Sequence, residues 1–209
     1  MIGLFGGTFD PIHFGHLRPA LEVMEKLSLD EVRFIPANIP PHRGQPEHST
    51  EARAEMVALA IQGQPGFVLD ACELKRDTPS YTVDTLSLLR QSLGGSTPFV
   101  LLLGSDAFAG LPSWHQWERL LQLTHIAVMT RPGEYPRKAQ FPPGYLERRL
   151  VDNASDLRQQ PAGSILRVPV TQLDISATMI RELLQQERSV RYLLPQSVVD
   201  HIHTHHLYS

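Results

Sequence analysis

The sequence predicts an α/β fold in which a doubly wound parallel sheet carries helices on both faces. Three observations support this prediction: short apolar segments alternate with helical ones, no hairpin signal joins consecutive strands, and the segment Phe99 to Leu103 is apolar throughout. Alternating strands and helices build parallel sheets, whose central strands are buried on both faces. The 209 residues, 42% of them hydrophobic, favour a single domain, 1–209, with a helical C-terminal portion, 170–209, packed on it.

The first strand and the first helix enclose a glycine-rich segment. Residues 2–5 are apolar, and apolar residues recur at helical spacing over 17–27. Between them lies Gly6 to His16 (GGTFDPIHFGH), where adjacent glycines let the backbone turn sharply and approach a ligand. The helix opens near Gly15 and His16, and its N-terminus is an anion site suited to phosphate. Because His13 and His16 are three residues apart, both imidazoles can face one bound group.

The next elements lead to two further ligand candidates. Residues 31–36 read as a strand, and paired prolines force the following loop, 37–44, into an extended path at the strand's carboxyl end. His42 in this loop either donates to a phosphate or belongs to an ordinary solvated loop. Ser49 and Thr50 cap a helix at 51–61, and 67–69 is a short strand. Another helix starts near Ser80 to Thr85, where hydroxyl groups either cap it or meet a ligand.

The second half of the chain continues the alternation. After the strand 99–103 comes Gly104 to Asp106, a small acidic turn suited to a sugar hydroxyl. Leu111 opens a short helix that places Trp114 and Trp117 on one side, Trp117 in the core and Trp114 at the active edge, where it can stack on a flat ring. Strands at 125–129 and 165–168 flank a polar segment that is helical only around 145–151.

The C-terminal part begins with a second candidate anion site. Ser176 is a natural N-cap for a helix reaching Gln186, and Arg181 falls in its second turn. A last helix passes through Val199 and Ile202. Near its end, His201 and His205 are four residues apart, but no carboxylate or cysteine completes a set of metal ligands, so an exposed helix end is expected.

Composition excludes several classes of protein. The 19 Lys and Arg nearly balance the 22 Asp and Glu, and no basic run is interleaved with aromatic residues, so nucleic acid is not an expected partner. Cys72, the single cysteine, excludes an internal disulfide and is expected to be a small buried residue. The sequence has neither a signal-peptide pattern nor an apolar run of membrane-spanning length, so we expect no membrane association and a cytoplasmic location.

Two motifs resemble those of a known superfamily. The segment His13-Phe14-Gly15-His16 resembles the H-x-G-H motif with which nucleotidyltransferases bind the phosphates of ATP. The segment 175–181 (ISATMIR) resembles their ISSTxxR motif, with Ala177 replacing the second serine. Class I aminoacyl-tRNA synthetases share the first motif, but 209 residues leave little room for their anticodon-binding module. Further matches, PPHR at 40–43, PSYT at 79–82, 104–106 and 112–114, make the whole chain similar to the bacterial nicotinate-nucleotide adenylyltransferases.

This resemblance implies a Rossmann-like nucleotidyltransferase fold and a reaction of NAD biosynthesis. ATP and nicotinate mononucleotide would give nicotinate adenine dinucleotide and pyrophosphate by direct in-line attack, with no protein nucleophile. Mg²⁺ would bind through the substrate phosphates, without protein ligands, and the enzyme would be a monomer or a homodimer. The implied catalytic residues are His13 and His16. The implied ATP-binding residues are Gly6, Gly7, Thr8, Phe9, His13, His16, Ser176, Thr178 and Arg181. The implied mononucleotide-binding residues are His42, Thr82, Asp106, Trp114 and Arg131.

Several alternatives stay open. The acceptor is nicotinate mononucleotide, nicotinamide mononucleotide or phosphopantetheine, although a pantetheine arm gives no evident role to Trp114. A non-catalytic nucleotide sensor is the rival from another class, but such a protein could lose His13, His16 or Arg181, and this chain keeps all three. Asp10 either fixes its loop by a hydrogen bond or assists the metal. His115 stands where the family often has an aromatic residue, which leaves the details of base recognition open.

Overall fold

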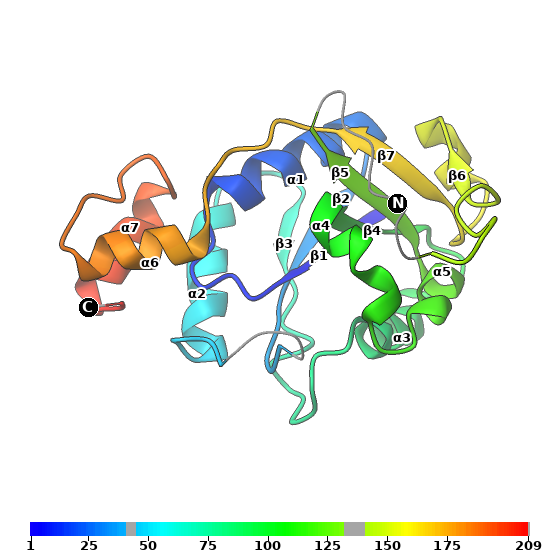
Figure 1. The fold of residues 1–209 in the computed structure, drawn as a ribbon. Helices are drawn as coiled ribbons and strands as arrows, with labels where there is room; N and C mark the ends of the chain where they lie inside the picture. The colour runs from blue at the N-terminus through cyan, green and yellow to red at the C-terminus, as the bar shows by residue number, and fades with distance from the viewer. Residues whose placement is uncertain (41–44, 132–140, 209) are drawn as a thin grey trace.

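The computed structural model describes residues 1–40, 45–131 and 141–208. Within them, seven strands form one sheet in which every pair is parallel (Figure 1). The strands are β1 (Ile2–Gly7), β2 (Glu31–Pro36), β3 (Phe67–Leu69), β4 (Phe99–Gly104), β5 (His125–Thr130), β6 (Leu150–Val151) and β7 (Ile165–Pro169). Their order across the sheet is β3-β2-β1-β4-β5-β7-β6.

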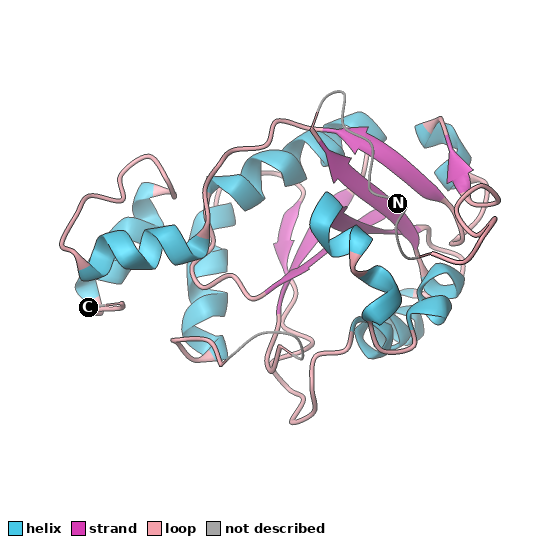
Figure 2. Ribbon diagram, viewed as in Figure 1, coloured by secondary structure: helices cyan, strands magenta, loops and turns pink. Residues whose placement is uncertain are grey.

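Helices cover both faces of this sheet (Figure 2). They are α1 (Phe14–Leu27), α2 (Thr50–Ile61), α3 (Thr82–Leu93), α4 (Ser105–Ala109), α5 (Leu120–Leu123), α6 (Ala177–Gln185) and α7 (Gln196–Thr204). Three 3₁₀ turns accompany them: η1 (Leu111–Ser113), η2 (Trp117–Arg119) and η3 (Ala154–Arg158). The predicted doubly wound α/β sheet is confirmed. In the described part of the chain, no helix combines the length and apolar character needed to cross a bilayer.

The core consists of two apolar clusters separated by the sheet. Phe5 of β1 belongs to the cluster under α1, α2, α6 and α7, whereas its neighbour Leu4 belongs to the cluster under α3, α4 and α5. Successive side chains of a strand point to opposite faces, so a strand covered on both sides must be apolar throughout. Phe99 to Leu103 of β4 meets this condition with every residue buried.

The strand order places a crevice beside the first strand. From β1 the chain moves outward to β2 and β3, then returns to pair β4 with the other side of β1. In open parallel sheets, ligands bind outside the carboxyl ends of the strands where the order reverses in this way. That point lies between the end of β1 at Gly7 and the end of β4 at Gly104.

The structure corrects the predicted turn at the two glycines. Gly6 and Gly7 do not turn the chain, because both are the last residues of β1 and pair in register with Ile35 and Pro36 of β2. The chain turns later, where Phe9 adopts a left-handed φ of 50°. The first helix also begins earlier than expected, at Phe14.

Other local predictions in the second half were also wrong. Trp114 and Trp117 do not share a helix, because Trp114 is extended and Gln116 is left-handed between η1 and η2. The expected turn at 104–106 is instead the end of β4 and the start of α4. The helical stretch expected at 145–151 is a series of turns leading into β6, a strand that the sequence did not indicate.

Candidate active site

The loop after β1 is shaped by an aromatic side chain that turns back under it. Phe9 is 3% exposed, and its ring packs edge-on against those of Phe5 and His16, with centroids 5.8 and 5.2 Å away. A Cβ on Gly7 would lie 2.8 Å from the Phe9 ring. Glycine is therefore needed at this position for packing, not for a turn, and Phe9 can offer a ligand only its backbone.

The two motif histidines lie against each other at the start of α1. His13 is the N-cap residue, and its backbone N–H points to Nδ1 of His16 at 3.4 Å. The two ring centroids are 3.8 Å apart with 32° between the planes. A Cβ on Gly15 would lie 2.9 Å from the His13 ring and 3.1 Å from the carbonyl oxygen of Ile175. The glycine between the histidines therefore lets the His13 ring and the chain before α6 approach the same helix start.

His13 is buried and electrically neutral at pH 7. It is 4% exposed, and its Nδ1 has no hydrogen-bond partner among the described residues. Burial disfavours the imidazolium and lowers the pKa of His13 to about 4. This imidazole can therefore donate an N–H bond to a phosphate oxygen, but it does not bring a positive charge at physiological pH.

The second motif meets the first at the N-terminus of α6. Ser176 caps this helix, as predicted, by accepting a bond from the N–H of Met179 at 3.1 Å. Arg181 lies one turn further and reaches back to the loop after β1, where its Nη1 donates to the carbonyl of Asp10 at 2.8 Å. Its Nε donates to Glu47 Oε1 at 2.6 Å. Thr178 is exposed in the first turn. We call the histidine pair with Ser176, Thr178 and Arg181 the phosphate side.

Two buried polar residues, Asp10 and Arg53, hold the backbone next to the phosphate side through hydrogen bonds. Both carboxylate oxygens of Asp10 accept protein bonds, from the Glu47 N–H at 2.8 Å and from the Tyr208 hydroxyl at 2.6 Å. This favours the loop-fixing role for Asp10 over a role as metal ligand. Arg53 of α2 is 1% exposed and donates to the carbonyls of Thr8 and Ala37 at 2.6 and 2.8 Å.

The sequence reasoning did not single out Arg53 or Tyr208. For Arg53 a signal existed, since an arginine three residues before Met56 falls on the apolar stripe of α2. Tyr208 gave none.

The other part of the site is a cavity of about 390 Å³ next to the end of β1. Thr82, the first residue of α3, and Trp114 both line it, together with Gly7, Thr8 and His115. A smaller inner cavity of about 90 Å³ shares the walls formed by Thr82 and Trp114. We call this pair of cavities the acceptor side.

Capping does not explain the hydroxyl groups at the start of α3. Ser80 accepts from the backbone N–H groups of Asn38 and Ile39, at 3.0 and 3.3 Å, so it fixes the loop after β2. The N-cap residue is Tyr81, which makes no side-chain capping bond. The ring of His115 lies over that of Tyr81, with centroids 4.3 Å apart.

The inner cavity also contains a buried acid that the sequence reasoning treated as part of a polar turn. Glu73 is 6% exposed, and its Oε1 accepts from the Thr85 hydroxyl at 2.5 Å. Among the described residues its Oε2 has no partner. Burial raises the pKa of Glu73.

The remaining predicted residues lie farther from these cavities or outside the description. Asp106 is exposed in the first turn of α4 and is not in the wall of either cavity, whereas its neighbour Ala107 is. Arg131 follows β5, is exposed and donates to Gln172 Oε1 at 3.1 Å. His42 falls outside the described residues.

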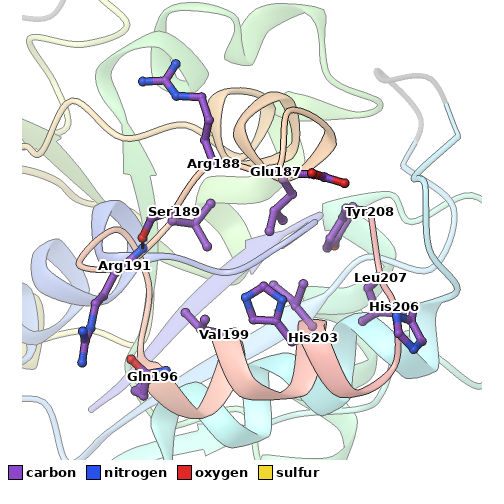
Figure 3. Close-up of a pocket in the computed structure, with 13 residues that line it drawn as sticks. Glu187, Arg188, Ser189, Arg191, Gln196, Val199, His203, His206, Leu207 and Tyr208 are labelled. Atoms are coloured by element: carbon purple, nitrogen blue, oxygen red, sulfur yellow. Dashed lines mark hydrogen bonds between the residues drawn. The ribbon is translucent and has the colours of Figure 1, made fainter.

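No metal centre is evident in the described ranges, because no three His, Cys, Asp or Glu side chains there are grouped to hold an ion. A larger cavity of about 710 Å³ lies between α6, α7 and the segment that follows α7 (Figure 3). Figure 3 shows Arg188 and Arg191 pointing away from it.

Known proteins resemble this chain in sequence and in fold. A family model described as cytidylyltransferase-like matches residues 4–183. A probable nicotinate-nucleotide adenylyltransferase from Dechloromonas aromatica is 50% identical over 99% of this chain and 97% of its own length. One from Halorhodospira halophila is 51% identical over 94% of this chain and 90% of its own.

The chain belongs to the nicotinate-nucleotide adenylyltransferase family. The family predicted from the two motifs is thereby confirmed. Among solved structures, a Plasmodium falciparum nicotinic acid mononucleotide adenylyltransferase complexed with NaAD has a TM-score of 0.71 at 18% identity, covering 99% of this chain and 96% of that chain. A putative member from Vibrio parahaemolyticus has a TM-score of 0.64 at 15% identity and covers 99% of this chain and 94% of its own. At these identities the likeness concerns the fold, which this chain shares with both.

Proposed function

We propose that this member of the family transfers the adenylyl group of ATP to nicotinate mononucleotide. The proposal rests on how residues are arranged between the ends of β1 and β4, where the strand order reverses. Two helix N-termini with the histidine pair and Arg181 lie at one part of the crevice, and a cavity lined by Thr82 and Trp114 lies at the other. One part suits a triphosphate and the other a flat ring bearing a small anion.

In the proposed reaction a phosphate oxygen of the mononucleotide attacks the α-phosphorus of ATP. The bond from that phosphorus to the bridging oxygen of the β-phosphate breaks, and pyrophosphate leaves with the electron pair. His16 and the neutral His13 donate to the α-phosphate as charge moves to the leaving group. Ser176, Thr178 and Arg181 hold the β- and γ-phosphates. Because a guanidinium has five N–H donors, Arg181 can bind phosphate while keeping its bonds to Asp10 and Glu47.

Mg²⁺ enters this scheme as part of the ATP substrate. Bound to the phosphates, it neutralises charge on the pyrophosphate. The engagement of both Asp10 carboxylate oxygens by Glu47 and Tyr208 supports a metal held by substrate and water.

On the acceptor side, Trp114 stacks on the pyridine ring. The Thr82 hydroxyl, with backbone N–H groups after Trp114, binds the nicotinate carboxylate. Asp106 and Arg131 reach the ribose and phosphate portions only from the rim of the site. We further propose that the enzyme works in the cytoplasm as a monomer or a homodimer, independently of nucleic acid.

The test is pyrophosphate release from ATP and Mg²⁺ with three acceptors in parallel: nicotinate mononucleotide, nicotinamide mononucleotide and phosphopantetheine. We expect release with the nicotinate compound to exceed release with the amide by at least about tenfold, the scale of one charge-assisted hydrogen bond. Release with phosphopantetheine alone would refute the roles of Thr82 and Trp114. If no acceptor gave pyrophosphate release although ATP bound, the alternative of a non-catalytic nucleotide sensor would be favoured.

A further inference from the structure

The residues after α7 reach the nucleotide-binding loop from the far end of the chain. The Tyr208 hydroxyl donates to Asp10 Oδ1 at 2.6 Å across 198 residues of sequence. Tyr208 is 4% exposed and Asp10 is 5% exposed, so this is a buried contact. Figure 3 shows His206, Leu207 and Tyr208 beyond the last turn of α7.

Tyr208 is itself held in place by its surroundings. Its backbone N–H donates to Nε2 of His48 at 3.1 Å, and the two rings meet edge-on with centroids 4.3 Å apart. The preceding residue, Leu207, donates its N–H to the carbonyl of Ile202 in α7 at 3.0 Å. The Tyr208 ring also belongs to the apolar cluster under α1 and α2. Packing therefore fixes the ring, and the hydroxyl serves as a directed donor.

Asp10, the acceptor of this bond, joins three segments of the phosphate side. Its Oδ2 accepts the Glu47 N–H, and its carbonyl accepts Nη1 of Arg181. Arg181 is in turn bonded to the Glu47 carboxylate. A displacement of Asp10 would therefore be felt directly at the Arg181 guanidinium and, three residues along the chain, at His13.

We propose that Tyr208 is a positioning residue for ATP: its hydroxyl orients Asp10 and so holds Arg181 and the start of α1 in the arrangement that receives the triphosphate. This inference rests on the proposed function. Without the hydroxyl, Oδ1 of a buried carboxylate loses its donor, and the loop after β1 must move to recover one from water. The burial that raises the pKa of Tyr208 keeps its hydroxyl protonated, as a donor requires.

The variant that tests this is Tyr208→Phe, which keeps the ring and removes only the donor. We expect kcat/KM for ATP to fall by about tenfold, the scale of one hydrogen bond to a charged group, while KM for nicotinate mononucleotide stays within twofold. The matched control is Tyr192→Phe at a tyrosine that is 81% exposed, which should match the wild type. Thermal unfolding of all variants tests for general destabilisation.

Two further measurements separate this inference from the function on which it rests. Calorimetric binding of an α,β-methylene analogue of ATP needs no acceptor, so weaker binding by Tyr208→Phe supports the inference even if nicotinate mononucleotide is not the substrate. In an Asp10→Ala background, which offers the hydroxyl no side-chain acceptor, adding Tyr208→Phe should cause little further loss, because the hydroxyl acts through Asp10. Analogue binding equal to wild type, or losses that multiply in the double variant, would overturn it. So would an equal rise in KM for both substrates with a lowered unfolding temperature.

Discussion

The phosphate side and the acceptor side of the site are built in different ways. On the phosphate side, buried polar groups join segments far apart in sequence: Arg53 bonds the Thr8 carbonyl, and Arg181 bonds the Asp10 carbonyl. On the acceptor side the ligand-facing side chains stand on short turns. Trp114 follows a single 3₁₀ turn, and the ring of the exposed His115 lies over that of Tyr81.

The two sides should therefore differ in how well they tolerate amino-acid substitutions. Transfer at phosphorus depends on a fixed arrangement of donors, which buried hydrogen bonds to the backbone maintain without the bound ligand. The choice of acceptor depends on a few half-buried side chains on short turns, which can change without disturbing the sheet. Substitutions of the buried residues that support the phosphate side should affect stability and turnover, whereas those on the acceptor side should change recognition of the mononucleotide alone.

The largest effect is expected for Arg53→Met. Methionine keeps much of the volume but leaves the carbonyls of Thr8 and Ala37 without their donor, so the free energy of unfolding should fall by about 3 kcal/mol or more. Turnover should fall as well, because the Thr8 carbonyl belongs to the nucleotide-binding loop. Denaturant unfolding and steady-state kinetics measure the two effects.

Arg90→Met provides the matched control. Arg90 also donates to backbone carbonyls, those of Leu123, Thr97 and Pro161, but lies under the other apolar cluster, over the Phe99 ring. This variant should lose stability and keep its KM for ATP. If Arg53→Met were as stable and as active as the wild type, the proposed rigidity of the phosphate side would be wrong.

For His16→Ala we expect turnover to fall by about a hundredfold or more, the scale observed when one preorganised donor to a developing charge is removed. Stability should change little, because His16 is only half-buried. Substituting the exposed His203 by alanine is the control, and it should leave turnover unchanged. Normal turnover in His16→Ala would exclude this histidine from the mechanism.

On the acceptor side, Trp114→Ala should lower kcat/KM for nicotinate mononucleotide by about ten- to a hundredfold, as loss of one ring-stacking contact does. KM for ATP should stay the same. Trp117→Ala is the counterpart, since Trp117 packs on Phe141 and Tyr145 and should affect stability without affecting recognition. If both variants changed KM for ATP, the two sides would not be separable.

How far the sequence predicts this molecule depends on the range of the interactions. The strands and the two motifs are local patterns, and for this reason β1, β4 and the Ser176 cap were predictable. The partners of Asp10 were not, because Tyr208 is 198 residues away and follows no periodic pattern. The buried side of α2 was partly predictable, but a charged residue such as Arg53 is normally assigned to the surface.

The predictions for short elements in the second half of the chain were wrong for a different reason. The three-residue spacing of Trp114 and Trp117 suits a helix, but the extended backbone at Trp114 and the left-handed Gln116 interrupt it. Packing decides such conformations, and propensity does not. The edge strand β6 likewise pairs with β7 through only Leu150 and Val151, a stretch too short to show an alternation of apolar and polar residues.

A smaller effect distinguishes the two sides through pH, because burial lowers the pKa of His13 on the phosphate side and raises the pKa of Glu73 on the acceptor side. His13 has a pKa of about 4 in the folded chain and a normal value of 6.5 when unfolded. The unfolded chain therefore binds the extra proton first as the pH falls, and stability present above pH 6.5 is lost toward pH 4. Between pH 7 and pH 5, His13 should lower the free energy of unfolding by about 1 to 2 kcal/mol.

Denaturant unfolding of the wild type and His13→Gln at the two pH values measures this loss, which should shrink in the variant. The comparison between variants is needed because buried His125 also has a pKa lowered by burial. Glu73 has the opposite effect on stability. Burial raises its pKa, so the folded chain binds the proton more readily than the unfolded chain does, and stability decreases as the pH rises from the unfolded pKa toward the folded one. Glu73→Gln should therefore steepen the loss on acidification, whereas His13→Gln should flatten it. Parallel pH profiles for all three proteins would show that neither group is buried as described.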